Sequence, residues 1–159
     1  MTEDPLDDFW NLAREHARLV GVPGYFGQTP LGALPPPAWA FGDSPEMADR
    51  LLGLVLDGTK TATASLASDY EAEGEPLPEP GTLGILTDGD GVPRALIATT
   101  EVRVVPFAEV DDEHARLEGE GDGSLASWRS DHARFFGIAA DAAPGPDVVL
   151  ERFAVLYQS

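Results

Sequence analysis

The residue types best suited to chemistry lie in one short segment, Lys60 to Ser65 (KTATAS). Side chains two residues apart share a face of a strand, so the hydroxyls of Thr61, Thr63 and Ser65 would point to one side. Lys60 is off parity with Thr63 and could reach that side only from a turn after Gly58. The segment predicts either a half-exposed strand with threonines on its wet face, or the hydroxyl-lined floor of a cleft with a cation at its edge.

Lys60 is also the only lysine of the chain, because the other nine of its 10 basic residues are arginines. A lysine can lose its proton, whereas an arginine stays charged at any working pH. This use of lysine at a single position is a hint that the residue does something that arginine cannot do.

Two further groups of polar residues could contribute to a site. Acids alternate with glycines at 118–122 (EGEGD), which suits close turns of a solvated loop; the spacing is not that of a calcium loop, and we expect no metal and no cofactor. Glu101 lies on an otherwise apolar strand, where a charge needs a partner unless it points to water. Trp128 and His132 are spaced i, i+4 and share a helix face, as core residues or as part of a site.

The net charge of -18, from 28 acids against 10 bases, repels phosphate backbones and anionic lipid. It disfavours double-stranded DNA and membranes as partners, but leaves room for a nucleoside-sized ligand or a short single-stranded RNA. The absence of cysteine excludes disulfides and thiolate metal sites. No leader or membrane-spanning segment is visible, so we expect a soluble, cytoplasmic protein.

Helices interleaved with mostly antiparallel strands indicate an α+β fold. Ser44 and Pro45 mark the start of the clearest helix, and Gly58 its end. Turn residues at 88–91 (DGDG) join two strands in a hairpin. We predict helices at 6–20, 44–57, 111–117 and 124–136, strands at 61–66, 82–87, 94–105 and 148–157, an irregular Gly/Pro-rich connection at 21–40 and an acidic loop at 68–81.

An ordered set of short segments adds a resemblance. The set is Gly58-x-Lys60-Thr61-x-Thr63 after a helix, an acidic loop with Gly81, TTEV at 99–102, Pro106-Phe107-x-x-Val110, Glu118-Gly119-Glu120 and Trp128. In order and approximate spacing it resembles the ASCH family. The resemblance implies a mostly antiparallel PUA-like β-barrel with helices on its rim, and a cleft formed partly by the lysine segment. It divides the chain into an ASCH-like domain at 39–159 and an N-terminal helix and extension at 1–38, which we expect to pack on the domain.

The resemblance also implies functions. ASCH proteins have been proposed as RNA-binding modules, some relatives are small amidohydrolases acting on N4-acetylcytidine, and ribonuclease activity is attributed to others. The catalytic set of the amidohydrolases, a lysine, a threonine three residues later and a downstream glutamate, matches Lys60, Thr63 and Glu118, with Glu120 as the alternative acid. We expect the substrate to be bound by Thr61, Ser65, Tyr70, Glu101, Glu120, Trp128 and His132.

The chemistry of such a set is coherent. A neutral Lys60 could take the proton of Thr63 as it attacks an amide, and a glutamate could protonate the leaving amine. A charged Lys60 would instead anchor an anion or a carbonyl oxygen. Three functions stay open: a hydrolase of an N-acylated nucleoside-like amide, an RNA-binding module with or without ribonuclease activity, and a non-catalytic ligand-binding domain. An RNA-binding module could hold one splayed base stacked on Trp128 or Tyr70.

Overall fold

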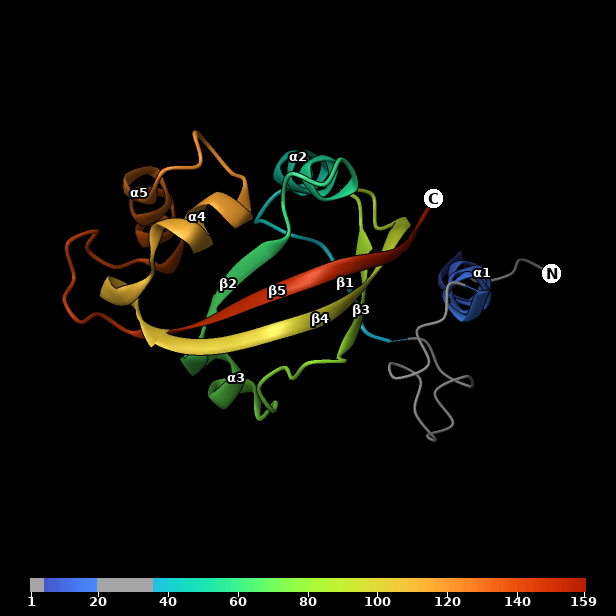
Figure 1. Ribbon diagram of the computed structural model, residues 1–159, viewed down its shortest axis with the longest axis horizontal. Helices are drawn as coiled ribbons and strands as arrows, with labels where there is room; N and C mark the ends of the chain where they lie inside the picture. The colour runs from blue at the N-terminus through green and yellow to red at the C-terminus, as the bar shows by residue number, and fades with distance from the viewer. Residues whose placement is uncertain (1–4, 20–35) are drawn as a thin grey trace.

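The computed structural model describes residues 5–19 and 36–159. These residues form an α+β fold built on one mixed sheet (Figure 1). In chain order its elements are α1 (Pro5–Leu19), β1 (Ala38–Trp39), α2 (Pro45–Leu56), β2 (Ala62–Leu66), α3 (Ala67–Glu73), β3 (Leu83–Thr87), β4 (Pro93–Pro106), the 3-10 helix η2 (Phe107–Glu109), α4 (Asp112–Glu118), α5 (Leu125–Phe136) and β5 (Asp147–Gln158).

Within the described residues the sheet has five strands, in the order β1-β3-β4-β5-β2. Only the β1–β3 pair is parallel, and the other pairs are antiparallel. The expected barrel is wrong, because β1 and β2 are edges that do not pair with each other. One reason is that Pro36 and Pro37 bring no backbone N–H to the ladder, so β1 pairs through only two residues. The two edges instead flank a cavity, which residues of both strands line.

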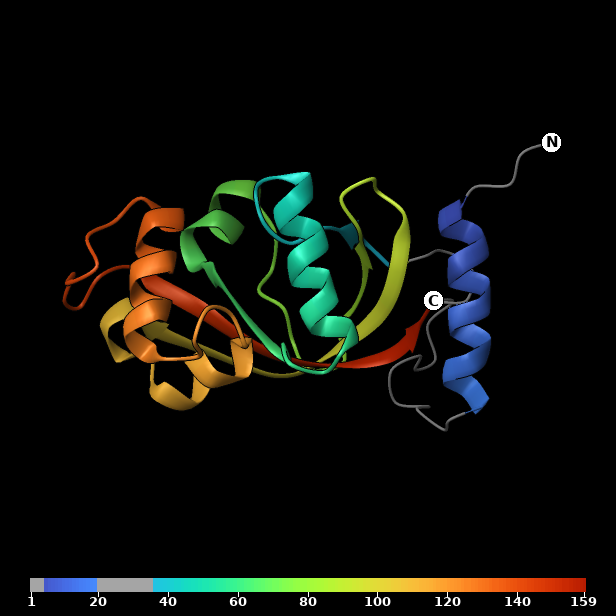
Figure 2. The same ribbon diagram turned by 90° about the horizontal axis from the view of Figure 1, so that it is seen from above.

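Helix α2 lies across one face of the sheet, between α1 at one end and α4 and α5 at the other (Figure 2). It begins where predicted, because the Ser44 side chain accepts a hydrogen bond from the backbone N–H of Met47. Its buried face packs on Leu86 and other sheet residues. The neighbouring Ile85 points the opposite way, toward Phe9 of α1, so the two helices cover opposite faces.

Among the described residues, three apolar clusters make up the core. One lies under α2, one joins α4 and α5 to the end of the sheet, and one lies under α1. The second cluster matters for function because it holds α4 and α5 together. Its buried members are Phe107, Val110, Ala115, Trp128, Ala133, Val148 and Leu150.

The predicted acidic loop at 68–81 is partly wrong, because α3 occupies Ala67–Glu73. The prediction gave weight to glycine and proline, but in this stretch both types begin at Gly74, where the helix ends. The residues of α3 contain no helix breaker.

The helix predicted at 6–20 is found as α1, with Val20 outside the described residues. Helix α1 packs on the sheet, whereas positions 21–35 of the extension also lie outside the described residues. The division at residue 38 stays a prediction. No helix in the described ranges is both long enough and apolar enough to span a bilayer.

Candidate functional site

A tight turn after α2 turns Lys60 inward. Gly58 adopts a left-handed backbone with φ +87°, a conformation that glycine reaches without strain. The backbone N–H groups of Thr59 and Lys60 both donate to the carbonyl of Leu54, and the Asp57 carboxylate accepts from the N–H of Thr59. Lys60 therefore enters the interior from the turn, ahead of β2, and its side chain is only 1% exposed.

Three acceptors surround the Lys60 amine. Its Nζ lies 2.9 Å from the carbonyl oxygen of Ala62, 2.9 Å from Glu120 Oε2 and 3.4 Å from Glu118 Oε1. The Phe41 ring lies 5.1 Å from Nζ, within cation–π range. An ammonium group has three donors, and here each has an acceptor. The resting geometry is that of a charged lysine.

Glu118, the last residue of α4, is the most heavily bonded acid of the site. Its Oε2 accepts from His114 Nε2 and Trp128 Nε1, both at 2.6 Å, and its Oε1 lies 3.2 Å from His132 Nε2. Burial opposes its ionisation, but the bonds from His114 and His132 and the charge of Lys60 hold the pKa of Glu118 well below its usual range. Glu118 is thus a buried carboxyl that the site holds in its ionised form.

His132 is the second cation of the site. Its Nδ1 lies 2.9 Å from the backbone carbonyl of Trp128, while its Nε2 faces Glu118. Two acceptors at the two ring nitrogens require both to carry a proton. Burial alone would lower the pKa of His132, but the hydrogen bond and charge of Glu118 outweigh it and raise that pKa. The ring also stacks on Trp128, with centroids 4.2 Å apart.

Glu120 completes this group, and its carboxylate is the accessible one, at 21% exposure. The loop that carries it passes close to the lysine turn at Gly119, where φ is +67° and a Cβ would lie 2.5 Å from the carbonyl oxygen of Thr59. Only glycine fits there. Lys60, His132, Glu118 and Glu120, which we call the charged quartet, balance two positive charges against two negative ones.

The charged quartet opens onto a cavity of about 730 Å³. Thr63 and Ser65 of β2 line it, and the Ser65 hydroxyl lies 3.1 Å from the hydroxyl of Tyr70 on α3. Aromatic residues from several elements enclose the space, and among the described residues no arginine lines it. The acids along it are Asp69, Glu73, Glu75, Glu118, Glu120, Asp131 and Glu151, and its aromatic residues are Trp39, Phe41, Tyr70, Phe135 and Phe153.

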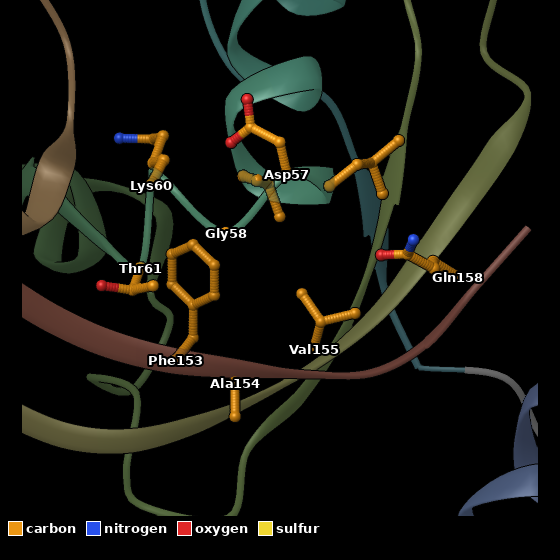
Figure 3. A pocket seen from close by; sticks show the side chains of 10 residues that line it. Asp57, Gly58, Lys60, Thr61, Phe153, Ala154, Val155 and Gln158 are labelled. Carbon is orange, nitrogen blue, oxygen red and sulfur yellow. The ribbon is translucent and has the colours of Figure 1, made fainter.

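Three of the expected substrate-binding residues do not line this cavity. Thr61 lines a smaller cavity of about 400 Å³ beside Phe153, and its hydroxyl donates to the carbonyl of Leu117 (Figure 3). Glu101 is 47% exposed and pairs with Arg152 at 3.1 Å, and Trp128 is buried beneath the charged quartet. In Figure 3 the amino group of Lys60 points away from the smaller cavity, which therefore meets only the lysine's stem.

Sequence reasoning missed His114 and Glu151. His114 precedes Glu118 by four residues on α4, a spacing that places both on one helix face and could have identified the pair. Glu151 lies opposite Thr63 in the β2–β5 ladder and lines the cavity. Its pairing partner is 88 positions away in the sequence, so no local pattern indicated it.

Glu118, Glu120 and His132 also offer ligand atoms within 4.8 Å of one another, as a metal site would. Two features disfavour a bound cation there. The Lys60 ammonium already contacts both carboxylates, and a metal-binding histidine must give up the proton that Glu118 stabilises on His132. That the site works without a metal stays a prediction.

The fold and the buried site define an α+β protein of PUA-like architecture. The family model described as the ASCH domain matches residues 37–157, and the chain belongs to this family. ASCH domains are associated with binding of RNA or small ligands and with hydrolase-like roles.

Two solved structures support the assignment. An ASCH domain from Lactobacillus crispatus JV V101 is 31% identical, with a TM-score of 0.71 over 91% of this chain and 96% of its own. A protein from Enterococcus faecalis V583 is 36% identical, with a TM-score of 0.69 over 86% of this chain and 93% of its own. No curated protein matches the chain significantly.

Proposed function

We propose that this protein is a small hydrolase that cleaves an N-acylated nucleoside-like amide with the side chains around Lys60. One observation carries the proposal: a fully buried lysine lies at the wall of a ligand-sized cavity, in contact with an accessible carboxylate, and a threonine hydroxyl lines the same cavity. A purely structural ion pair would not need a cavity at its side. The volume of about 730 Å³ is in the range of small-molecule sites.

Thr63 is the nucleophile of the proposed reaction. Its hydroxyl attacks the acyl carbon, the C–N bond breaks, and an acyl ester on Thr63 forms while the amine leaves. Water then hydrolyses the ester and returns the threonine. A hydroxyl is a weak nucleophile near neutral pH, so the first step needs a base beside it.

Lys60 and Glu120 supply the base and the acid as a pair. Lys60 rests as an ammonium, but its Nζ lies 2.9 Å from Glu120 Oε2, a distance across which a proton can move. A bound ligand that expels water favours the neutral amine and carboxylic acid over the two charges. The amine then takes the Thr63 proton, and the carboxylic acid gives its proton to the leaving nitrogen. The cycle returns both groups to their resting charges.

Glu118 is better suited to hold this pair in place than to donate a proton. The resemblance matched it to the catalytic glutamate of the family, but the pKa of Glu118 lies well below its usual range, since two histidines and Lys60 all stabilise its charge. We therefore assign the proton-donating role to Glu120. Glu118 and His132 act as positioning residues: Glu118 holds Nζ next to Glu120, at the wall of the cavity that Thr63 lines.

The test is a hydrolysis screen of N-acylated nucleosides, with N4-acetylcytidine first, followed by chromatography of the released nucleoside. We expect turnover by the wild type and loss of at least about a hundredfold in Lys60→Met and Thr63→Ala, because each removes a reacting group. Thr100→Ala is the matched control, since Thr100 is exposed and lies outside the cavity. Turnover that survives in Thr63→Ala would exclude the acyl ester.

Single-stranded RNA is the second candidate. Two exposed aromatic residues, Trp39 at 37% and Phe135 at 56%, line the cavity and could stack on one splayed base. The acids along the same cavity repel phosphates, so an RNA would enter by a base and not by its backbone. Titration of a short single strand at two salt concentrations tests this, and no binding at low salt would remove RNA from contention. Binding without turnover of either ligand would point to the third function, a non-catalytic binding domain.

A further inference from the structure

The cavity has two regions of different charge. The charged quartet forms the inner region, where positive and negative side chains balance. The outer region holds Glu151 of β5 and, on α3, Asp69, Tyr70 and Glu73. No lysine, arginine or histidine other than the two of the quartet lines the cavity among the described residues, and both of those already face Glu118.

Glu151 is the unusual residue of the outer region. It pairs with Thr63 across the β2–β5 ladder, so the two side chains lie side by side on the same face. The residue is half-buried, yet its carboxyl makes no hydrogen bond or ion pair with any described residue. Burial raises the pKa of Glu151. A partly buried carboxylate without a hydrogen-bond donor lowers the stability of the fold. Glu151 lines the cavity, so a donor can reach its carboxylate from there.

The neighbourhood decides which ligand groups are tolerated there. Burial first, and then the charges of Glu151, Glu73 and Asp69, raise the pKa of Tyr70. The three acids therefore make the space around Tyr70 negative, and no basic side chain of the outer region balances them. A phosphate placed over them would meet repulsion, whereas hydroxyl or amine donors would meet an acceptor without a partner.

We propose that Glu151 accepts hydrogen bonds from the sugar hydroxyls of the ligand and makes the site select an unphosphorylated nucleoside over its 5′-nucleotide. The inference rests on the proposed function, whose reacting groups take the acyl amide of the same ligand. The amide lies at Lys60 and Thr63, and the sugar hydroxyls reach the carboxyl of Glu151, at the far end of the side chain beside Thr63. No residue of the outer region takes part in bond cleavage.

The experiment compares N4-acetylcytidine with its 5′-monophosphate as substrates of wild type, Glu151→Gln and Glu71→Gln. Glu71 is exposed on α3 and does not line the cavity, so its variant removes the same charge from nearby. We expect wild type to prefer the nucleoside by at least about tenfold in kcat/KM, a preference that falls as salt is added. Glu151→Gln should raise KM for the nucleoside and leave kcat nearly unchanged, so the ratio of kcat/KM between nucleoside and 5′-monophosphate should fall. Glu71→Gln should leave this ratio as it is in wild type.

Equal use of both compounds by wild type, or an unchanged preference in Glu151→Gln, would overturn the inference. Binding of both compounds, measured by calorimetry, separates it from the proposed function. Binding that favours the nucleoside, is weakened in Glu151→Gln and leads to no hydrolysis would leave the selectivity standing and end the hydrolase proposal. Hydrolysis of the nucleoside and its 5′-monophosphate at equal rates would support the hydrolase proposal and overturn the selectivity. Failure of both compounds to bind would overturn both.

Discussion

Glu118 and Glu151 line the same cavity, and their surroundings differ in kind. Glu118 is 1% exposed and accepts from His114, Trp128, His132 and Lys60. Glu151 is half-buried and accepts from no described residue. Burial acts against the charge of both, but only Glu118 has donors that outweigh it, so the two pKa values move in opposite directions. Burial alone therefore does not decide a carboxyl's role: Glu118 is compensated within the fold, whereas Glu151 has its acceptor oxygens free for a donor from outside it.

The largest expected effect is that of Glu118→Gln on stability. The substitution removes the counter-charge of Lys60 and His132 inside the protein, and breaking a buried ion pair in this way costs about 3–5 kcal/mol. Urea unfolding measures it. Glu101→Gln, which disrupts the exposed pair with Arg152, should change stability by about 0.5 kcal/mol or less. Equal losses of stability in Glu118→Gln and Glu101→Gln would contradict the claim that the fold itself compensates the buried charge of Glu118.

The pH dependence of His132 gives a second test. Its folded-state pKa is raised above 6.5, so its contribution to stability is fully present below that value and is lost as the pH rises through the folded pKa. Wild type should therefore exceed His132→Gln in stability by more at pH 6 than at pH 9. A gap that widens toward pH 9 would show that Glu118 does not hold the ring as an imidazolium.

The smallest expected effect is that of Glu151→Gln, which should raise stability where Glu118→Gln lowers it. Because the pKa of Glu151 is raised, its carboxyl favours folding when protonated, and this contribution is lost as the pH rises through the folded value. Glu151→Gln should then stabilise the protein at pH 7, by roughly 1 kcal/mol or less, and make no difference near pH 4. Thermal unfolding at the two pH values measures this. Destabilisation at pH 7 would mean that Glu151 has a favourable partner in the fold.

The sequence predicted most of the elements because their signals are local. Ser44 and Pro45 begin α2, and Gly58 follows its end. In the predicted hairpin turn, the Asp88 carboxylate accepts hydrogen bonds from the backbone N–H groups of Asp90 and Val92. Helix α3 was missed because the glycines and prolines after Gly74 received too much weight. Closure of the sheet was also predicted wrongly. The prolines before β1 are visible in the sequence, but whether β1 and β2 meet also depends on tertiary packing, which the sequence does not show.

The site was predictable only in part. Lys60 stood out by its uniqueness and the turn before it, and the resemblance supplied Thr63, Glu118 and Glu120, which lie with it along one cavity. What these residues do there stays a prediction. Glu151 could not be found from sequence, because strand register set it opposite Thr63. Thr61 was predicted to share the face of Thr63, but it lies ahead of β2, where the strand's alternation has not begun.

The most direct test of the account is the rate of N4-acetylcytidine hydrolysis by Lys60→Arg, with binding measured in parallel. An arginine keeps the positive charge beside Glu118 and Glu120 but cannot give up its proton to become a base. If Lys60 and Glu120 exchange a proton during the reaction, Lys60→Arg should still bind the nucleoside and should lose at least about a hundredfold in kcat. Hydrolysis by Lys60→Arg at near the wild-type rate would contradict the account and leave Lys60 as a fixed charge.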